Sequence, residues 1–518
     1  MTTAAPRYVC IHGHFYQPPR ENPWLEAIEV EDSAAPYHDW NARITAECYA
    51  PNAAARLVDH RNAIVDIVNN FARMSFNVGP TLLSWLERER PEVYAAILSA
   101  DHDSQQRFAG HGNAMAQIYN HVIMPLATRE EKQLQIRWGI ADFRHRFQRD
   151  PEGMWLPETA VDLETLTLLA EAGIRFVVLA PSQAQRIRPV SGGDWIDVSG
   201  GRINPRRSYV CRLPPHQGRS IAVLFYDAPI ARAVAFEGLL SRSEAFVQRL
   251  RDAFVDNDPL PQLVHIATDG ESYGHHHRFG ERALAFALHH IERLAPVELI
   301  NYGAFLDRHP PSVEVEIIEG SSWSCAHGVE RWRSDCGCRM GSVPSWRQSW
   351  RGPLREALNW LAGQTDRVYR EQGSRLFKDA GAALREYIQV LLQPTEEMRQ
   401  QFLAAHQQHA LTAAERTRAW RLLDMMRYRH LMYTSCGWFF DDISGLETAQ
   451  ILKYAARALQ FAETATGAAL EAEFRRRLAQ APSNVPTFRD GGGVYDRLVK
   501  PLWTDIRALE DASHGSRA

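Results

Sequence analysis

Short apolar runs alternate with segments of helical character up to about residue 340, a pattern typical of α/β folds. Several of these runs are apolar throughout, as expected for parallel strands buried on both faces. We therefore predict a parallel α/β domain closed into a (β/α) barrel. The expected strands are residues 8–11, 74–78, 175–180, 221–226 and 263–268.

Helical patterns connect these strands and then dominate the rest of the chain. Residues 53–71 and 161–172 are predicted helices of the α/β domain, and Gly173 is a suitable residue to end the second. Beyond residue 350 the strand pattern fades, and an all-helical domain is expected. We place the boundary between residues 1–345 and 346–518. The predicted helices of the second domain are 353–392, 395–409, 413–433 and 447–465.

Composition narrows the class of protein. The net charge is −4, from 58 basic and 62 acidic residues, which argues against a nucleic-acid partner. The sequence also shows no apolar run long enough for a membrane span and no signal peptide. Seven scattered cysteines argue against a disulfide framework, so we expect a reduced, cytoplasmic setting.

Metal binding is not expected from the cysteine spacing. Cys336 and Cys338 are closer together than the usual zinc-binding pair, and no second pair follows them. We therefore predict neither a metal nor a cofactor.

Two predicted strands end in carboxylates. Glu158 follows the brief run 154–157, while Asp269 and Glu271 follow the run 263–268. Acids at the carboxyl ends of barrel strands lie on the catalytic face, and two opposed carboxyls are the minimum for cleaving a glycosidic bond. The alternatives are an acid that favours a helix N-terminus and an ordinary Asp-Gly turn.

Three further segments combine polar and aromatic residues that suit a sugar ligand. The first spans residues 10–19, the second 110–121 and the third 321–332. Each also has a structural interpretation, as a loop with satisfied histidines, a polar loop before a helix, or a loop anchored by Trp. The candidate substrate-binding residues are His12, His14, Gln17, Trp24, His111, Asn113, Trp155, Glu271, Trp323, His327 and Trp332.

In chain order these five segments resemble the five sequence regions of glycoside hydrolase family 57. "MWLPE" is similar to the region with the family's nucleophile, and "ATDGESYG" to the region with its acid/base. The resemblance implies that Glu158 is the nucleophile and Asp269 the general acid/base of a retaining enzyme on α-linked glucose polymers. It further implies an incomplete seven-stranded (β/α)7 barrel, and the C-terminal part resembles a helical domain of unknown function.

The resemblance is weaker in two regions, which bear on specificity. "GHGNAMAQ" and "SSWSCAHGVERWRSDCGC" depart from the better-known amylase and branching-enzyme versions. Hydrolysis, 4-α-glucan transfer and branching share one first chemical step, so the sequence does not separate them, nor does it give an oligomeric state. For retaining chemistry we expect the two carboxyls to lie about 5–6 Å apart.

Two rival interpretations stay open at this stage. One is a metal-dependent polysaccharide deacetylase or α-mannosidase-like enzyme, with ligands from His12, His14, Asp269 and residues 275–277. The other is a non-catalytic carbohydrate-binding protein, against which the presence of both acids argues.

Overall fold

The computed structural model describes residues 5–59, 61, 63–214, 218–293, 296–341 and 343–503. Its contacts divide the chain into two units. The first unit comprises Met1–Gln17 and Val30–Gly328, and the second comprises Pro18–Glu29 and Val329–Ala518. The boundary expected at residues 345/346 stays a prediction, and the outermost ends of both predicted domains lie outside the described residues.

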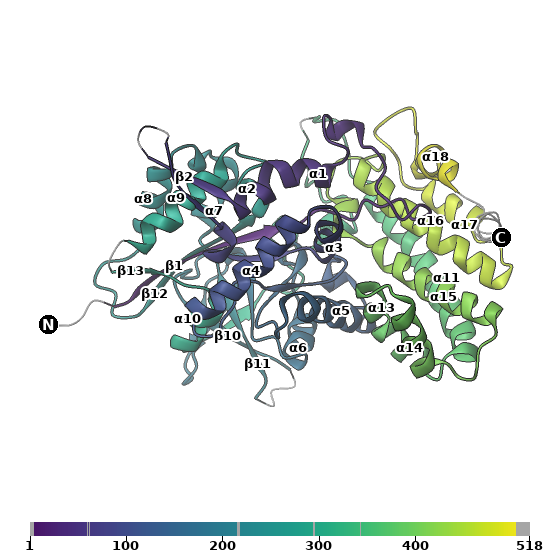
Figure 1. Cartoon of the computed structure of the whole chain (residues 1–518), viewed down its shortest axis with the longest axis horizontal. Helices are drawn as coiled ribbons and strands as arrows, with labels where there is room; N and C mark the ends of the chain where they lie inside the picture. The colour runs from purple at the N-terminus through teal and green to yellow at the C-terminus, as the bar shows by residue number, and fades with distance from the viewer. Residues whose placement is uncertain are drawn as a thin grey trace. The chain divides into compact units, whose positions relative to one another are not determined.

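All five predicted strands are present in the first unit. They are β1 (Arg7–Phe15), β4 (Ser75–Val78), β7 (Phe176–Leu179), β11 (Ser220–Phe225) and β12 (Gln262–Asp269). Strand β1 pairs in parallel with β12 along most of its length and with β4 near its end, as Figure 1 shows for β1 and β12. Because neighbours flank it on both sides, β1 is buried from its second residue onward.

Very short strands extend the parallel pairing. Strand β5 (Ala116–Gln117) pairs with β6 (Met154–Trp155), and β7 pairs with β11, both in parallel. Parallel bridges from Phe76 to Ala114 and from Gly153 to Phe176 join these pairs to their neighbours. The described unit is therefore a mixed α/β structure in which parallel pairing is extensive.

Sequence patterns missed the remaining strands of this unit. These are β2 (Ala55–Val58), β3 (Ile64–Val68), β8 (Ala184–Pro189), β9 (Ile196–Asp197), β10 (Ser208–Arg212), β13 (Val297–Leu299) and β14 (Val313–Ile317). Strands β8, β9, β10 and β14 share a six-stranded sheet with β7 and β11. The β10–β11 and β14–β8 pairs are antiparallel, so this sheet is mixed.

The predicted helix over residues 53–71 is wrong. The structure has an antiparallel hairpin there, formed by β2 and β3. Ala55, Leu57 and Val68 form a small core with Ala285, while Ile64 and Ile67 are exposed. Ala55 and Leu57 alternate along β2 and are buried with Val68 against Ala285, and this tertiary burial overrides the apparent helical spacing.

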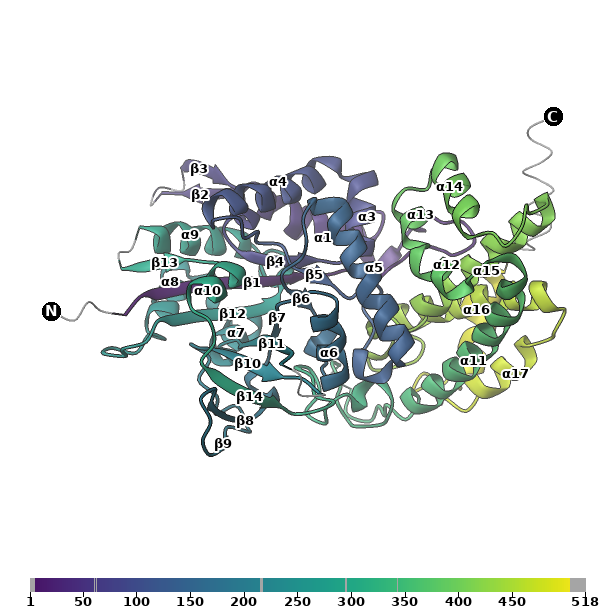
Figure 2. The same cartoon turned by 90° about the horizontal axis from the view of Figure 1, so that it is seen from below.

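Helices connect the strands of the first unit. Helix α6 (Leu163–Glu171) confirms the prediction for residues 161–172, and Asp162 caps its first turn. Helices α5 (Arg129–Phe147) and α6 pack against each other (Figure 2). The other helices described here are α1 (Trp40–Ile44), α2 (Ala50–Ala53), α3 (Pro80–Glu89), α4 (Pro91–Arg107), α7 (Ala228–Phe236), α8 (Ser243–Arg251), α9 (Gly280–Glu292) and α10 (Tyr302–Arg308).

The second unit is helical, as expected. Helices α11 (Arg351–Leu376), α15 (Ala413–Leu431) and α16 (Leu446–Thr466) pack on one another. The segment expected as one helix, 353–392, is interrupted after α11, because Asp379 caps a new helix. The remaining helices are α12 (Ala380–Glu386), α13 (Ile388–Leu392), α14 (Glu396–His406), α17 (Glu471–Leu478) and α18 (Gly491–Val494).

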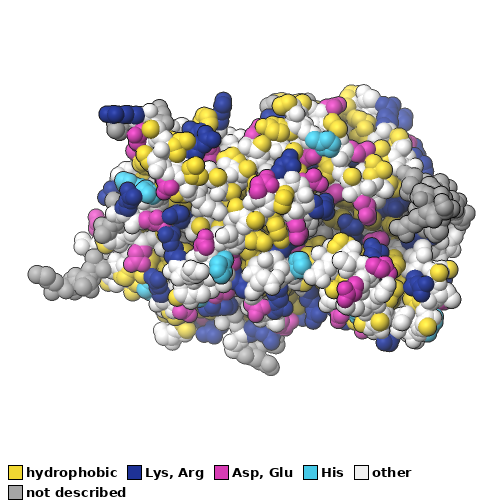
Figure 3. Space-filling view, viewed as in Figure 1, with side chains coloured by type: hydrophobic (Ala, Val, Ile, Leu, Met, Phe, Trp, Pro, Cys, Tyr) yellow, Lys and Arg dark blue, Asp and Glu magenta, His cyan; other side chains and the backbone are white. Residues whose placement is uncertain are grey.

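The surface carries charges of both signs. Basic and acidic side chains are interspersed on the face seen in Figure 3, in keeping with the small net charge. Within the described ranges, no helix is both long and apolar enough to cross a membrane.

A close approach between α5 and β5 yields a stability prediction. A Cβ atom built at Gly139 would lie 2.1 Å from the carbonyl oxygen of Gln117, so Gly139→Ala must push α5 away from β5. We expect Gly139→Ala to lower the free energy of unfolding by about 1–3 kcal/mol, measured by chemical denaturation.

The control is Gly363→Ala, at an exposed position of α11 with open space around it. It should raise the free energy of unfolding by about 0.5–1 kcal/mol, because alanine favours a helix over glycine. Equal effects of the two changes would refute the role given to Gly139.

Candidate active site

Glu158 lies just beyond β6 in a strained turn. Its φ and ψ are 58° and 20°, and Thr159 also has a positive φ of 49°. Left-handed backbone at residues other than glycine costs about 1–3 kcal/mol and is concentrated at functional sites. Gln183 holds the turn, since its Oε1 accepts from the Thr159 hydroxyl and its Nε2 donates to the Thr159 carbonyl, both at 2.8 Å.

Two side chains donate to the Glu158 carboxylate. The Trp323 indole nitrogen lies 2.9 Å from Oε2, and the Ser324 hydroxyl lies 2.6 Å from the same oxygen. The Trp323 backbone N–H also donates to the Glu158 carbonyl at 3.0 Å. Donors aimed at a carboxylate favour its ionised form, and they fix the direction in which the second oxygen points.

Asp269 ends β12 and has a strongly perturbed carboxyl. Loss of hydration is the main cause that raises its pKa to about 7, and the negative charge of Glu158 raises it further. The side chain is nevertheless accessible to solvent. The surrounding protein excludes much of the bulk water from the carboxyl. Because the residue is still partly accessible, a substrate could reach it. The carboxyl separation of about 5–6 Å stays a prediction.

A stack of neutral rings lies beside Glu158's partner Trp323. Trp155 stacks on His12 and His14, with ring centroids 4.9 Å and 5.0 Å away, and meets Trp323 edge-on at 5.2 Å. Burial lowers the pKa of His12 to about 3 and that of His14 well below its ordinary value. Both rings are therefore uncharged near neutral pH, and they add no positive charge that would hold Asp269 ionised.

Asn77 joins both histidines to the next strand. Its Oδ1 lies 3.0 Å from His12 Nε2, and its Nδ2 lies 2.8 Å from His14 Nδ1. The same Nδ2 donates to Gln117 Oε1 at 2.6 Å, and His12 Nδ1 lies 3.1 Å from the Ser75 hydroxyl. Because both ring nitrogens of His12 are engaged with protein, this geometry favours a supporting role for His12. Its contact with sugar stays a prediction.

Glu271 lies close to Asp269 but is held inside the protein. The Tyr49 hydroxyl and the Tyr16 backbone N–H donate to its Oε1 at 2.6 Å and 3.0 Å. Burial raises the pKa of Glu271 to about 8, and the charge of Asp269 contributes. Gln17 hydrogen-bonds Tyr49 and is also buried. Glu271 and Gln17 are thus both buried and both bound to Tyr49, and their predicted contacts with substrate stay predictions.

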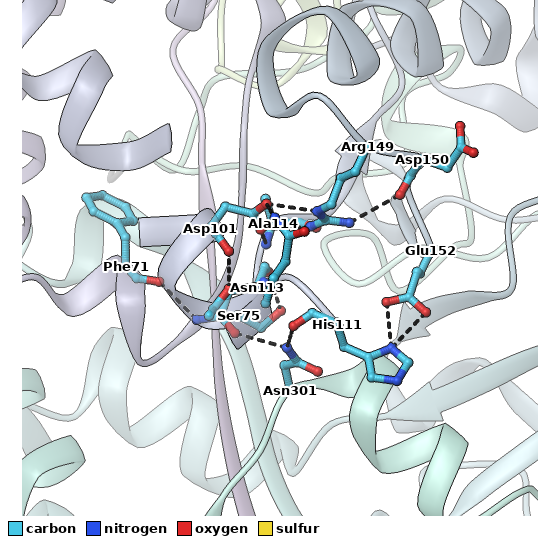
Figure 4. A network of polar contacts seen from close by, with 12 residues as sticks. Phe71, Ser75, Asp101, His111, Asn113, Ala114, Arg149, Asp150, Glu152 and Asn301 are labelled. Carbon is cyan, nitrogen blue, oxygen red and sulfur yellow. Dashed lines mark hydrogen bonds and ion pairs between the residues drawn. The ribbon is translucent and has the colours of Figure 1, made fainter. Parts of the chain in front are cut away.

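His111 and Asn113 belong to a polar network, shown in Figure 4, which Ser75 connects to His12. Asn113 donates to the Phe71 carbonyl at 3.0 Å and accepts from Asn301 at 3.1 Å. His111 Nδ1 lies 2.9 Å from Glu152. These bonds fix the loop before β5, so the geometry favours the structural interpretation of this segment over direct binding of sugar hydroxyls.

The remaining predicted contacts with substrate, those of Trp24, Trp332 and His327, stay predictions. Trp24 and Trp332 belong to the second unit, where their indole nitrogens donate to Gln460 and to the Ser435 carbonyl. Trp332 is completely buried, as a structural anchor is. His327 belongs to the first unit and follows Trp323 and Ser324 in the same loop.

Tyr226 is a site residue that sequence patterns missed. It follows β11 and is almost fully buried; burial raises its pKa, as does the charge of Asp269. Its ring meets that of Trp323 edge-on at 6.2 Å, so it links the surroundings of the two carboxyls. Its position at the end of a predicted strand is the sequence feature that could have indicated a site residue.

Comparison with known proteins places this arrangement in a family. Residues 11–317, more than half of the chain, match the model of glycosyl hydrolase family 57. The chain belongs to glycosyl hydrolase family 57. Residues 346–512 match a domain of unknown function, DUF3536.

Individual relatives of this family 57 chain agree with the assignment. Alpha-amylase 1 of Dictyoglomus thermophilum is 30% identical over 98 residues, which span 19% of this chain and only 13% of that protein. An exo-type maltose-forming amylase from Pyrococcus sp. ST04 has a similar structure, with a TM-score of 0.70 and 15% identity over 98% of this chain and 94% of that one. A branching enzyme from Pyrococcus horikoshii has a TM-score of 0.54 and 15% identity over 96% of both chains. At these identities the structures show a shared fold.

Because the pKa of Asp269 is raised in the folded chain, removal of its carboxyl should stabilise the fold by an amount that depends on pH. Its ordinary pKa of 3.8 applies to the unfolded chain, whereas the folded value is about 7. Between these values the folded chain holds a proton that the unfolded chain has released, so this group destabilises the fold increasingly as the pH rises. Asp269→Asn should match the parent at pH 4 and melt at a higher temperature at pH 8, as followed by circular dichroism. A gain of the same size at both pH values would contradict the raised pKa.

Proposed function

We propose that this family 57 member is a retaining glycoside hydrolase or transglycosylase that acts on α-linked glucose chains. Glu158 is the nucleophile and Asp269 the general acid/base. One observation carries the proposal: Glu158 receives hydrogen bonds from the Trp323 and Ser324 side chains, while burial and, second, the charge of Glu158 raise the pKa of Asp269 toward neutrality. The two carboxyls are thus biased toward opposite protonation states, as this chemistry requires.

The mechanism follows from these states. Ionised Glu158, held by Trp323 and Ser324, attacks the anomeric carbon, while Asp269 donates its proton to the departing glycosidic oxygen. Esterification then removes the charge of Glu158, and the pKa of Asp269 falls because one of the two causes of its rise is gone. Asp269 can now accept a proton from water or from a sugar hydroxyl, and the second displacement restores the original configuration.

We infer that the parallel strands form a seven-stranded barrel in the order β1, β4, β5, β6, β7, β11, β12. The parallel pairs and bridges between successive members support this order. A bond from the Asp227 backbone N–H to the His265 carbonyl, 2.8 Å long, supports closure between β11 and β12. In such a barrel Glu158, Tyr226 and Asp269 all follow or end strands at the carboxyl face, where barrel active sites lie.

The choice of substrate rests on the relatives and on the aromatic surroundings. The similar proteins are an α-amylase, a maltose-forming amylase and a branching enzyme, as their names state. The Trp155 indole nitrogen is buried and has no hydrogen-bond partner among the described residues, which leaves a donor for a polar ligand. Hydrolysis, transfer and branching diverge only after the glycosyl-enzyme has formed.

Removal of the nucleophile tests the proposal. Glu158→Gln should reduce kcat/KM on maltooligosaccharides and soluble starch by a factor of about 10⁴ or more, because the amide cannot form the ester intermediate. The matched control is Glu152→Gln, which changes a carboxylate that binds His111 and Arg175 instead. Near-parental turnover of Glu158→Gln, at unchanged folding, would refute the assignment.

The indole of Trp323 should affect kcat more than KM. Trp323→Phe keeps a ring but removes the N–H that donates to Glu158. Since a hydrogen bond to a charged group contributes about 1.5–3 kcal/mol, we expect kcat to fall roughly 10- to 100-fold.

Trp195→Phe is the control, because that ring packs with Arg186 and Arg188. A Trp323→Phe enzyme with parental kcat would show that the indole does not orient the nucleophile.

A further inference from the structure

The hydroxyl group of Tyr226 differs from those of the other buried tyrosines of the first unit. A buried tyrosine hydroxyl normally has a hydrogen-bond partner, because the loss of its hydration is otherwise uncompensated. Tyr8, Tyr49, Tyr209, Tyr273 and Tyr302 follow this rule, and their partners are the His309 ring, the Glu271 carboxylate, the Asn204 carbonyl, the Thr268 hydroxyl and the His265 ring, in that order. Tyr226 is also buried, with 7% of its surface exposed, but none of the described residues hydrogen-bonds its hydroxyl.

The oxygen of this hydroxyl is not sealed inside the protein. The indole nitrogen of Trp155 is fully enclosed without a partner, whereas the Tyr226 oxygen is not among the atoms enclosed in this way, so it keeps contact with solvent. A hydroxyl of this kind can bind a ligand without first breaking a hydrogen bond to the protein.

We propose that Tyr226 contacts the substrate and donates a hydrogen bond to a hydroxyl group of the sugar ring that reacts between Glu158 and Asp269. This inference rests on the proposed function. The ring of Tyr226 meets that of Trp323 edge-on, with centroids 6.2 Å apart, and the Trp323 indole donates to the Glu158 carboxylate. Tyr226 therefore lies against the side chain that orients the nucleophile.

Electrostatic interactions keep the Tyr226 hydroxyl in its donor form. Burial raises the pKa of Tyr226, and the negative charge of Asp269 raises it further, so the oxygen keeps its proton well above neutral pH. The influence of Asp269 also indicates that Tyr226 lies near the second carboxyl. A neutral O–H suits an uncharged sugar hydroxyl and adds no charge that would change the protonation of either carboxyl.

The backbone fixes Tyr226 before any substrate binds. Its N–H donates to the carbonyl of Leu179, the last residue of β7, at 3.3 Å, and the next N–H, that of Asp227, donates to the His265 carbonyl in β12 at 2.8 Å. The Asp227 carboxylate also accepts from the Ile230 N–H at 3.0 Å and caps α7. Because the chain is held on both sides, the side chain loses little freedom when it binds a ligand.

Thermal stability tests whether the Tyr226 hydroxyl is free of the fold. Tyr226→Phe removes an oxygen that bonds none of the described residues, so its melting temperature should equal or exceed that of the parent. Tyr8→Phe is the matched control, since it removes a buried hydroxyl that lies 3.1 Å from His309 Nε2, and it should lower the melting temperature. A fall for Tyr226→Phe as large as that for Tyr8→Phe would overturn the proposal.

Deoxygenated substrates test the contact itself. The probe is α-maltosyl fluoride, whose reacting ring carries hydroxyls at C2, C3 and C6, together with the analogues that each lack one of them. Tyr226→Phe should lower kcat/KM on the complete substrate roughly 10-fold, the loss expected for one uncharged hydrogen bond. On the analogue that lacks the bound hydroxyl, variant and parent should have equal kcat/KM, because neither can form the bond.

Two kinetic results would overturn the proposal. One is parental kcat/KM of Tyr226→Phe on the complete substrate, and the other is an equal fall on every analogue, which a purely structural role would produce. Tyr8→Phe should match the parent on all of these substrates.

Binding separates failure of this inference from failure of the proposed function. In the Glu158→Gln background, which should not consume the sugar, Tyr226→Phe should raise the Kd of α-maltosyl fluoride about 10-fold by calorimetry. If Glu158→Gln abolishes turnover but Tyr226→Phe changes neither Kd nor kcat/KM, only the role of Tyr226 is wrong. If Glu158→Gln keeps near-parental turnover, the nucleophile assignment fails, and the deoxygenated substrates still decide the contact of Tyr226. A parent that neither binds nor cleaves this sugar would overturn both.

Discussion

The unequal environments of two carboxyl groups, Glu158 and Asp269, are the constraint on which the proposed chemistry depends. Glu158 and Asp269 come from strands far apart in sequence, and the charge of one raises the pKa of the other. Ionisation of both would be unfavourable, so the protein distinguishes them by environment. Two donors stabilise the charge of Glu158, whereas loss of hydration favours the neutral form of Asp269. The proposed division of chemical roles, nucleophile and acid/base, follows from that difference.

The remaining site residues preserve this asymmetry. His12 and His14 are kept neutral by burial, so two imidazoles can lie against Trp155 without adding a positive charge to the site. The left-handed backbone of Glu158 is tolerated because Gln183 holds the turn from two sides. Strain and desolvation at the site are offset by a well-buried parallel core in which β1 is central.

The sequence predicted those features that depend on local pattern. Continuous apolar runs identified β1, β4, β7, β11 and β12, and acids at strand ends identified Glu158 and Asp269 as candidates. Features that depend on tertiary contacts could not be predicted from the sequence. The β2–β3 hairpin depends on burial against α9. Asn77 and Ser324 form their hydrogen bonds with His12 and Glu158, which are distant in sequence. Polar residues that looked free to bind sugar, such as Asn113, turned out to have their hydrogen bonds satisfied within the protein.

The most direct test of the two-carboxyl account is to trap the glycosyl-enzyme. A 5-fluoro maltosyl fluoride of α configuration forms an ester that breaks down slowly, and peptide mass spectrometry then locates the attached sugar. The account predicts one label, on the carboxylate of Glu158, which Glu158→Gln abolishes. A label on Asp269, or turnover without any label and with inverted product configuration, would contradict it.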